Sequence, residues 1–176
     1  PPFEQGPTHP AVNLSWDDAQ DFCRWLTARE RRAGVISDKE HYRLPLDHEW
    51  SCAEGVARLE NAEATPRWKG PQQPDVFLWG REWPPPPDAG NFRSEECLPQ
   101  ATGASAAPVM VIKGRRDPFI FTAPVGSFAP GPFGLLDLSG NALEWCEDWR
   151  EPQDRELRVM RGGSFFLNDG AAASSA

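Results

Sequence analysis

Apolar residues recur with a helical period near the start of the chain. They stand at i, i+3, i+4 and i+7 along one side of a helix, as Ala19, Phe22, Cys23 and Leu26. Ser15 precedes them as a suitable N-cap, and the acids that follow it favour a helix N-terminus. Gly34 is a typical helix stop. The pattern predicts a helix from Ser15 to about Ala33.

A second, shorter helix is predicted to begin with Asp47 as its N-cap. Its buried side carries Trp50, Ala53 and Ala57. The residues before it, 41–44, are expected to form a short strand or an extended entry. Large apolar side chains from both ends of the chain are expected to form the core, namely Trp16, Phe22, Leu26, Trp50, Trp145 and Trp149.

Between residues 60 and 118 the chain changes character, because Pro, Gly, Asn and charged residues dominate. Four consecutive prolines at 84–87 exclude a helix there. A linker between two units would explain this stretch, but neither half holds a complete set of elements, so one domain over 1–176 is preferred. The last third is expected to contain short strands and turns at 119–125, 134–138, 141–149 and 158–166. These features predict a loop-rich α+β domain.

The amino-acid composition argues against several classes of binding partner and metal site. Eighteen Lys and Arg against 26 Asp and Glu give a net charge of −8, so a nucleic-acid-binding face is not expected. No run approaches the roughly 18 apolar residues of a membrane span, so no membrane partner is expected. The four cysteines form no Cys-x-x-Cys pair, which argues against a zinc ribbon. Such cysteines favour a reducing compartment such as the cytoplasm, although one pair could still form a disulfide.

Carboxylates offer the clearest candidate chemistry. The three histidines have no zinc-site spacing, and the common nucleophile and phosphate-loop motifs do not occur. Asp137 and Glu144 flank a Gly-Asn turn, and such a loop can present carboxylate and carbonyl oxygens to calcium. From spacing alone, a turn whose acids face water is the favoured interpretation, and calcium is the alternative.

Three longer motifs occur in order: Leu-Pro-Leu-Asp-His-Glu-Trp at 44–50, Gly-Leu-Leu-Asp-Leu-Ser-Gly-Asn-Ala-Leu-Glu-Trp at 134–145 and Arg-Val-Met-Arg-Gly-Gly-Ser-Phe at 158–165. With segments 9–19 and 122–128, they resemble the formylglycine-generating enzyme (sulfatase-modifying factor) family. The resemblance implies a C-type-lectin-like α+β fold. The family's N-terminal strands and closing C-terminal strand are not matched, so the chain resembles the middle and late part of that domain.

The same resemblance implies two calcium sites, built from side-chain oxygens and backbone carbonyls. The first set is Asn91, the Phe92 carbonyl, Asp117 and the Phe119 carbonyl. The second set is Asp137, the Gly140 and Ala142 carbonyls, and Glu144. Calcium in these sets would clamp loops that lack a hydrogen-bonded ladder.

Catalysis is not expected from this sequence. Enzymes of the family bind copper through two cysteines, and the corresponding positions here are Leu167 and Ala172. Neither side chain can bind Cu(I), which prefers soft thiolates, so no copper is expected. A family Trp is replaced by Leu143, whereas Ser164 is kept. Cys146 is expected to be a core thiol rather than a substitute ligand.

Three functions remain open at this stage. The first is a non-catalytic, calcium-stabilised module that binds or displays, resembling the variable proteins of diversity-generating retroelements or accessory domains of bacterial signalling proteins. Its surface for a protein or small ligand would include Ser164, Phe166, Asn168 and Asp169, although this segment could equally be an ordinary polar loop. The second is a copper-dependent oxidase that converts a sulfatase cysteine to formylglycine. The third is a structural domain that supports a neighbour.

Overall fold

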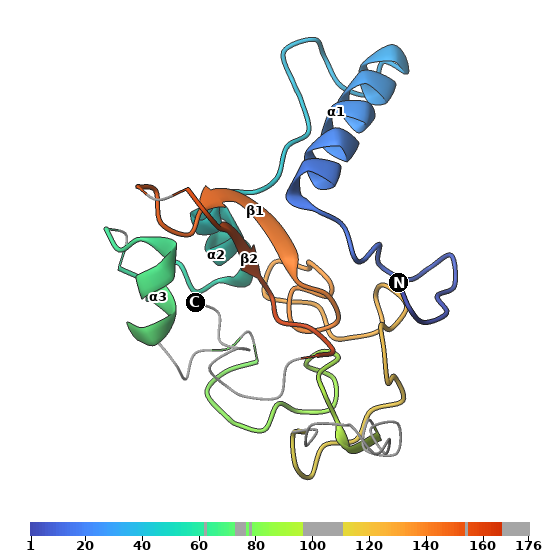
Figure 1. Cartoon of the computed structure of the whole chain (residues 1–176), viewed down its shortest axis with the longest axis vertical. Helices are drawn as coiled ribbons and strands as arrows, with labels where there is room; N and C mark the ends of the chain where they lie inside the picture. Colours follow the sequence, from blue (N-terminus) through green and yellow to red (C-terminus); the bar gives the residue numbers. More distant parts are fainter. Residues whose placement is uncertain (62, 73–76, 78, 97–110, 154, 167–176) are drawn as a thin grey trace.

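The structure is a computed structural model that describes residues 1–61, 63–72, 77, 79–96, 111–153 and 155–166 of the 176-residue chain. Within them it contains helices α1 (Trp16–Arg32), α2 (Asp47–Glu54) and α3 (Pro66–Gln72) and strands β1 (Glu144–Trp149) and β2 (Arg158–Arg161). The two strands form an antiparallel hairpin, with α2 behind it and α3 beside it (Figure 1). Loops make up most of the remainder. Among the described residues, no helix combines the length and apolar character needed to cross a membrane.

Helix α1 forms where the sequence predicts it. Ser15 is the N-cap, its hydroxyl accepts from the Asp18 N–H, and the Asp18 carboxylate accepts from the Ser15 N–H in return. The side that faces the returning chain buries Cys23 and Thr27. The expectation that Phe22 is a core residue is wrong, because 57% of it is exposed. Phe22 lies at the edge of the apolar stripe, and the chain that returns from α1 covers the opposite edge.

Helix α2 begins one residue earlier than expected. Leu46 is its N-cap and Asp47 is its first residue, so the assignment of Asp47 as the cap is wrong. Glu49 accepts from the Leu46 N–H at 2.8 Å instead, which leaves the Asp47 carboxylate directed into the protein. Trp50 is buried as predicted, and Gly55 ends the helix with φ of 87°.

Of the two alternatives for residues 41–44, the extended entry holds, because these residues form no strand. Two other expectations about elements need correction. The region expected to be irregular contains α3, which opens at Pro66, a residue that suits the first helical turn. In the last third, regular pairing is limited to β1 and β2 among the described residues. Elsewhere in that third, turns and side chains satisfy the backbone, as Asn141 does for Ala123.

The main apolar cluster lies between α2 and the hairpin. It consists of Trp50, Leu138, Cys146 and Val159. A second cluster contains Phe77, Phe92 and Ile112, with Trp79 packed against it. Four residues expected in the core, Trp16, Leu26, Trp145 and Trp149, are only half-buried. The rings of Trp16 and Trp149 pack against a charged group outside the two apolar clusters, since the Arg158 guanidinium lies over them, 3.7 and 3.5 Å from their centroids.

A network of four buried charges joins α2, α3 and β2. Lys69 Nζ lies 2.7 Å from Asp47 Oδ2 and 3.2 Å from Glu60 Oε2. Arg161 pairs with the same two acids, and its guanidinium lies 4.5 Å from the Trp50 ring centroid. Burial opposes the charge on Lys69, but the hydrogen bonds and charges of Asp47 and Glu60 outweigh it and raise the Lys69 pKa. The network is therefore balanced in charge.

Replacing Arg161 should reveal how strongly this network is coupled to folding. We expect Arg161→Met to lower the free energy of unfolding by about 3–5 kcal/mol, because two buried carboxylates would share one cation. Urea denaturation measures the change. Arg24→Met, which removes an ion pair with Asp21 on the surface, is the control and should change the free energy by less than about 1 kcal/mol. Equal effects from the two variants would contradict the assigned role of the network.

Candidate functional site

Three loop segments meet where the expected calcium ligands lie. Asn91 forms a parallel β-bridge with Gly140, and the Asn141 N–H donates to the Asn91 carbonyl at 2.7 Å. The Gly140 N–H in turn donates to the Gly162 carbonyl at 2.5 Å. A Cβ on Gly140 would lie 2.6 Å from the Asn91 carbonyl oxygen, so this close approach requires glycine. Residues far apart in the sequence are thus brought together by backbone contacts.

The Asn141 side chain substitutes for a strand partner at this junction. Its Oδ1 accepts from the Ala123 N–H at 2.8 Å, and its Nδ2 donates to the Ala123 carbonyl at 3.2 Å. Asn141 is buried, and its own carbonyl accepts from the Phe165 N–H. One residue therefore connects the 123 segment to the segment that follows β2.

Three of the four residues of the second expected calcium set lie together in the structure. Asp137, Ala142 and Glu144 line one cavity of about 440 Å³, whereas Gly140 is not part of its lining. Asp137 Oδ2 accepts from the Gly126 N–H at 2.5 Å, whereas its Oδ1 is buried and has no hydrogen-bond partner. Glu144 Oε2 accepts from Trp50 Nε1 at 2.7 Å.

The electrostatics of this cavity disfavour two bare carboxylates. Burial raises the pKa of Glu144, the Trp50 hydrogen bond opposes that shift, and the nearby Asp137 charge adds to it. A cation between the two acids would remove both penalties. The donor types, two carboxylates with backbone carbonyls, suit calcium.

The first expected set is connected through a buried arginine. Asn91 Oδ1 and Asp117 Oδ2 are both buried without a hydrogen-bond partner. Asp117 Oδ1 accepts from the Phe119 N–H at 3.0 Å. Arg115 donates to the Gly90 carbonyl, and its Nε lies 3.6 Å from Asp117 Oδ2. Burial raises the pKa of Asp117, although the Phe119 hydrogen bond and the Arg115 charge oppose it.

Within the described part of the chain, no three His, Cys, Asp or Glu side chains gather at a metal-binding distance. The two expected sets do not require such a cluster. Each holds one or two carboxylates, and amide or carbonyl oxygens supply the other donors. Buried oxygens without a hydrogen-bond partner occur in both sets, so the residues present fit calcium.

A second, apolar cavity of about 380 Å³ opens beside the expected binding surface and shares Ala142 and Leu143 with the first. Its lining includes Phe3, Leu143, Trp145, Met160, Ser164 and Phe166. Two residues of the expected surface, Ser164 and Phe166, thus line it, whereas Asn168 and Asp169 lie outside the described residues. Leu167 and Ala172 also lie outside them.

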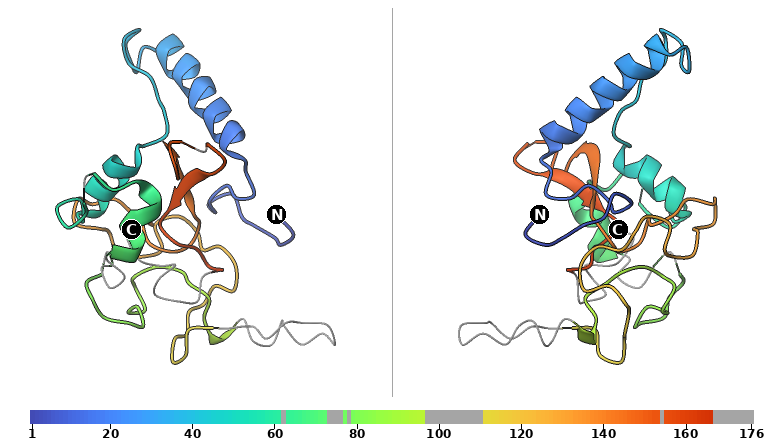
Figure 2. Two further views of the ribbon diagram at one scale, coloured as in Figure 1. Left: turned by 60° about the vertical axis from the view of Figure 1, so that its left-hand side comes forward. Right: turned by 90° about the vertical axis from the view of Figure 1, so that its right-hand side faces the viewer.

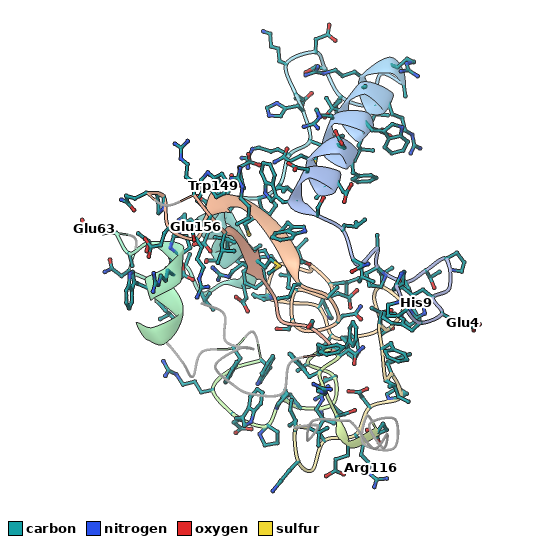
Figure 3. The ribbon with its side chains drawn as sticks, viewed as in Figure 1. Glu4, His9, Glu63, Arg116, Trp149 and Glu156 are labelled. Atoms are coloured by element: carbon teal, nitrogen blue, oxygen red, sulfur yellow. The ribbon has the colours of Figure 1, made fainter. Side chains whose placement is uncertain are left out.

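Sequence reasoning missed the N-terminal wall of this cavity. Phe3 stacks on Phe121 with ring centroids 4.4 Å apart. His9 Nδ1 lies 3.0 Å from Thr122 Oγ1, and Figure 3 shows His9 beside the loops that precede β1. The opening Pro-Pro-Phe sequence carries no helical or strand period, so only the aromatic residue itself could have drawn attention to it.

The fold and the site together define a loop-built domain in which helix α2 packs against a short hairpin. A sequence model described as the sulfatase-modifying factor enzyme 1-like domain matches residues 1–176. The chain therefore belongs to the formylglycine-generating enzyme family, as the motifs predicted.

The relatives include active and inactive proteins. The chain is 29% identical to a formylglycine-generating enzyme of Thermomonospora curvata over 93% of the chain and 46% of the relative. It is 27% identical to the inactive Cα-formylglycine-generating enzyme 2 of Bos taurus, over 93% of the chain and 41% of that relative. The solved structure of PvdO from Pseudomonas aeruginosa matches with a TM-score of 0.56 and 25% identity, over 99% of the chain and 57% of PvdO. The chain thus spans less than half the length of these two curated relatives.

Asn141 provides a direct test of the junction. We expect Asn141→Ala to lower the free energy of unfolding by about 1–3 kcal/mol, because the Ala123 N–H and carbonyl would both lose their buried partner. Chemical denaturation measures this change. Ser127→Ala, which removes an exposed hydroxyl bonded to the Pro124 carbonyl, is the control. A free energy unchanged in Asn141→Ala would show that the junction does not depend on this side chain.

Proposed function

We propose that the chain is a non-catalytic, calcium-stabilised binding module with a C-type-lectin-like fold. One observation carries the proposal. Asn91, Asp117 and Asp137 each bury an oxygen without a hydrogen-bond partner, at the positions that the family resemblance assigns to calcium. An unpaired buried oxygen costs about 1–3 kcal/mol, and a bound cation would compensate for it at all three positions.

The two sets should differ in affinity. Asp137 and Glu144 present two carboxylates to one cavity, and no cation of the protein pairs with either in the described contacts. In the other set, Arg115 already supplies a positive charge 3.6 Å from Asp117 Oδ2. Because affinity for calcium rises with the net negative charge of its ligands, the Asp137–Glu144 set should bind more tightly.

The thiols support the non-catalytic part of the proposal. Leu167 and Ala172 stand where the family's copper-binding cysteines would be. Cys146 is fully buried, and desolvation raises its pKa to about 12, so it is not a thiolate at neutral pH. The pKa of Cys23 is also raised, chiefly by burial. Cys146 therefore does not present the charged soft ligand that Cu(I) prefers.

The apolar cavity beside Ser164 is the proposed ligand site. Its lining is mainly aromatic and aliphatic, so it suits an apolar side chain of a protein partner or an apolar group of a small ligand. Ser164 and the backbone around it would provide the polar contacts. Such a module would serve as a display protein or as an accessory domain of a bacterial signalling protein.

Calcium should stabilise the protein measurably. At a free calcium concentration of 100 times Kd, a single site adds about 2.7 kcal/mol to the free energy of unfolding, so Tm should rise relative to protein in EGTA. Asp137→Asn and Glu144→Gln should each lose most of that rise. Differential scanning calorimetry with and without calcium measures it.

The matched control is Glu147→Gln, which removes a carboxylate on β1 that accepts from Gln20 and lies outside the calcium sets. It should keep the full calcium-dependent rise in Tm. A wild-type Tm that is identical in calcium and in EGTA would overturn the calcium part of the proposal.

The alternative function, oxidation of a sulfatase cysteine to formylglycine, is favoured by the formylglycine-generating enzymes among the relatives. We expect no conversion when a cysteine-containing sulfatase-motif peptide is incubated in air with this protein, Cu(I), calcium and a reductant. Mass spectrometry detects the aldehyde, and an active family enzyme is the positive control. Formation of the aldehyde by the folded protein would overturn the non-catalytic assignment.

A further inference from the structure

Helix α1 has a second organised side, opposite to the one it packs. Cys23 and Thr27 face the chain that returns from the helix. Four exposed residues follow one another at i, i+4, i+7 and i+11 on the other side, namely Asp18, Phe22, Trp25 and Arg29. We call these four residues the outer stripe. At this spacing they share one helix face.

The outer stripe is unusually apolar for an exposed surface. Phe22 and Trp25 are 57% and 53% exposed, and their ring centroids lie 5.6 Å apart. The Arg29 guanidinium lies over the Trp25 ring at 5.3 Å. Tryptophan and arginine are the residues that most often anchor protein interfaces. The views in Figures 1 and 2 agree that α1 projects from the body and that the returning chain follows only one side of it.

The outer stripe is self-complementary when two copies of α1 pack antiparallel. Phe22 and Trp25 are equally distant from the midpoint between residues 23 and 24, and so are Asp18 and Arg29. A second copy of α1 packed antiparallel about that point would place Phe22 against Trp25 of the partner. The same packing would place Asp18 against the partner's Arg29. This is the arrangement that an isologous two-fold contact requires.

The charges along the whole of α1 also favour antiparallel packing of the two helices. Acids occupy its first turn and bases its last, with Asp17 and Asp18 at one end and Arg29, Arg31 and Arg32 at the other. An antiparallel pair sets acids against bases, whereas a parallel pair would set like charges together. We propose that two copies of this chain dimerise through antiparallel contact of their α1 outer stripes.

The expected dimer is weak. Seventeen residues of helix are about 25 Å long, so one helix pair buries less than the roughly 1,200–2,000 Å² of a standard interface. Leu14, 46% exposed, and Ala33 would extend the contact, because they are symmetric about the same midpoint. We therefore expect a Kd in the micromolar range, about 1–100 μM.

Sedimentation velocity of the full chain, from about 1 to 300 μM, tests the proposal through charge reversal. In an Arg29→Glu dimer, the new acid of each copy would face Asp18 of the other, so two acids would meet at each end. In an Asp18→Lys dimer, two bases would meet at each end. Each variant alone should dimerise at least about tenfold more weakly than the wild type. An equimolar mixture should recover dimerisation, because the mixed pair has opposite charges at both ends.

Two controls separate dimerisation from folding. Arg24→Glu makes the same charge change on α1 outside the stripe and should dimerise like the wild type. Far-UV circular dichroism confirms that each variant keeps its helix, which matters for Asp18→Lys because Asp18 belongs to the capping box. A wild type that is monomeric up to 300 μM would overturn the proposal and assign the stripe to a different partner. Failure of the mixture to recover dimers would overturn the antiparallel arrangement.

Discussion

The buried charge network around Asp47 is the constraint on which the described structure depends. Two short strands provide little ladder hydrogen bonding, so the elements must be connected in another way. The Asp47 carboxylate binds Lys69 of α3 and Arg161 of β2, while its N–H donates to Asp148 of β1. Removing one member would leave two buried charges of one sign sharing a single counter-charge, and such a defect costs several kcal/mol. Three helix and strand contacts thus depend on one aspartate.

The loops that carry the expected calcium ligands are held in place next to Arg161, at one end of this network. Gly162 directly follows Arg161, and its carbonyl accepts from the Gly140 N–H. Gly140 pairs with Asn91 and lies between Asp137 and Glu144, the first residue of β1. The position of the carboxylates therefore follows from the position of β2. Calcium would add a second connection at the same loops, where buried oxygens lack partners.

Local rules predicted the local features of this chain. The Ser15 cap and the end of α1 follow from backbone chemistry that acts within a few residues. The end of α2 was not predicted, because the expected helix carried Ala57 and the observed one ends at Gly55. The exposure of Phe22 and the inward direction of Asp47 could not be predicted in this way, since both depend on which distant segment covers the helix. Helix α3 was missed because a short helix in a Pro-rich stretch has too few periodic residues to be recognised.

The sequence predicted the parts of the candidate site that lie close together in the chain better than the contacts between distant segments. Asp137 and Glu144 are close in sequence, so spacing alone made calcium one of two interpretations, the less favoured one. Asn91 and Asn141 are 50 residues apart, and neither spacing nor the calcium sets that the resemblance implies predicted their contact. The apolar cavity was partly anticipated through Ser164 and Phe166, but its N-terminal wall was not. Contacts between distant loops carry no periodic signal in the chain.

Metal content tests the central claim of this account most directly. Protein saturated with calcium, then dialysed at neutral pH against metal-free buffer without chelator, would be analysed by inductively coupled plasma mass spectrometry. The account predicts that the Asp137–Glu144 set retains calcium and that a second, weaker ion is recovered at higher free calcium, giving two per chain at saturation. Calcium at background level under saturating conditions would contradict it.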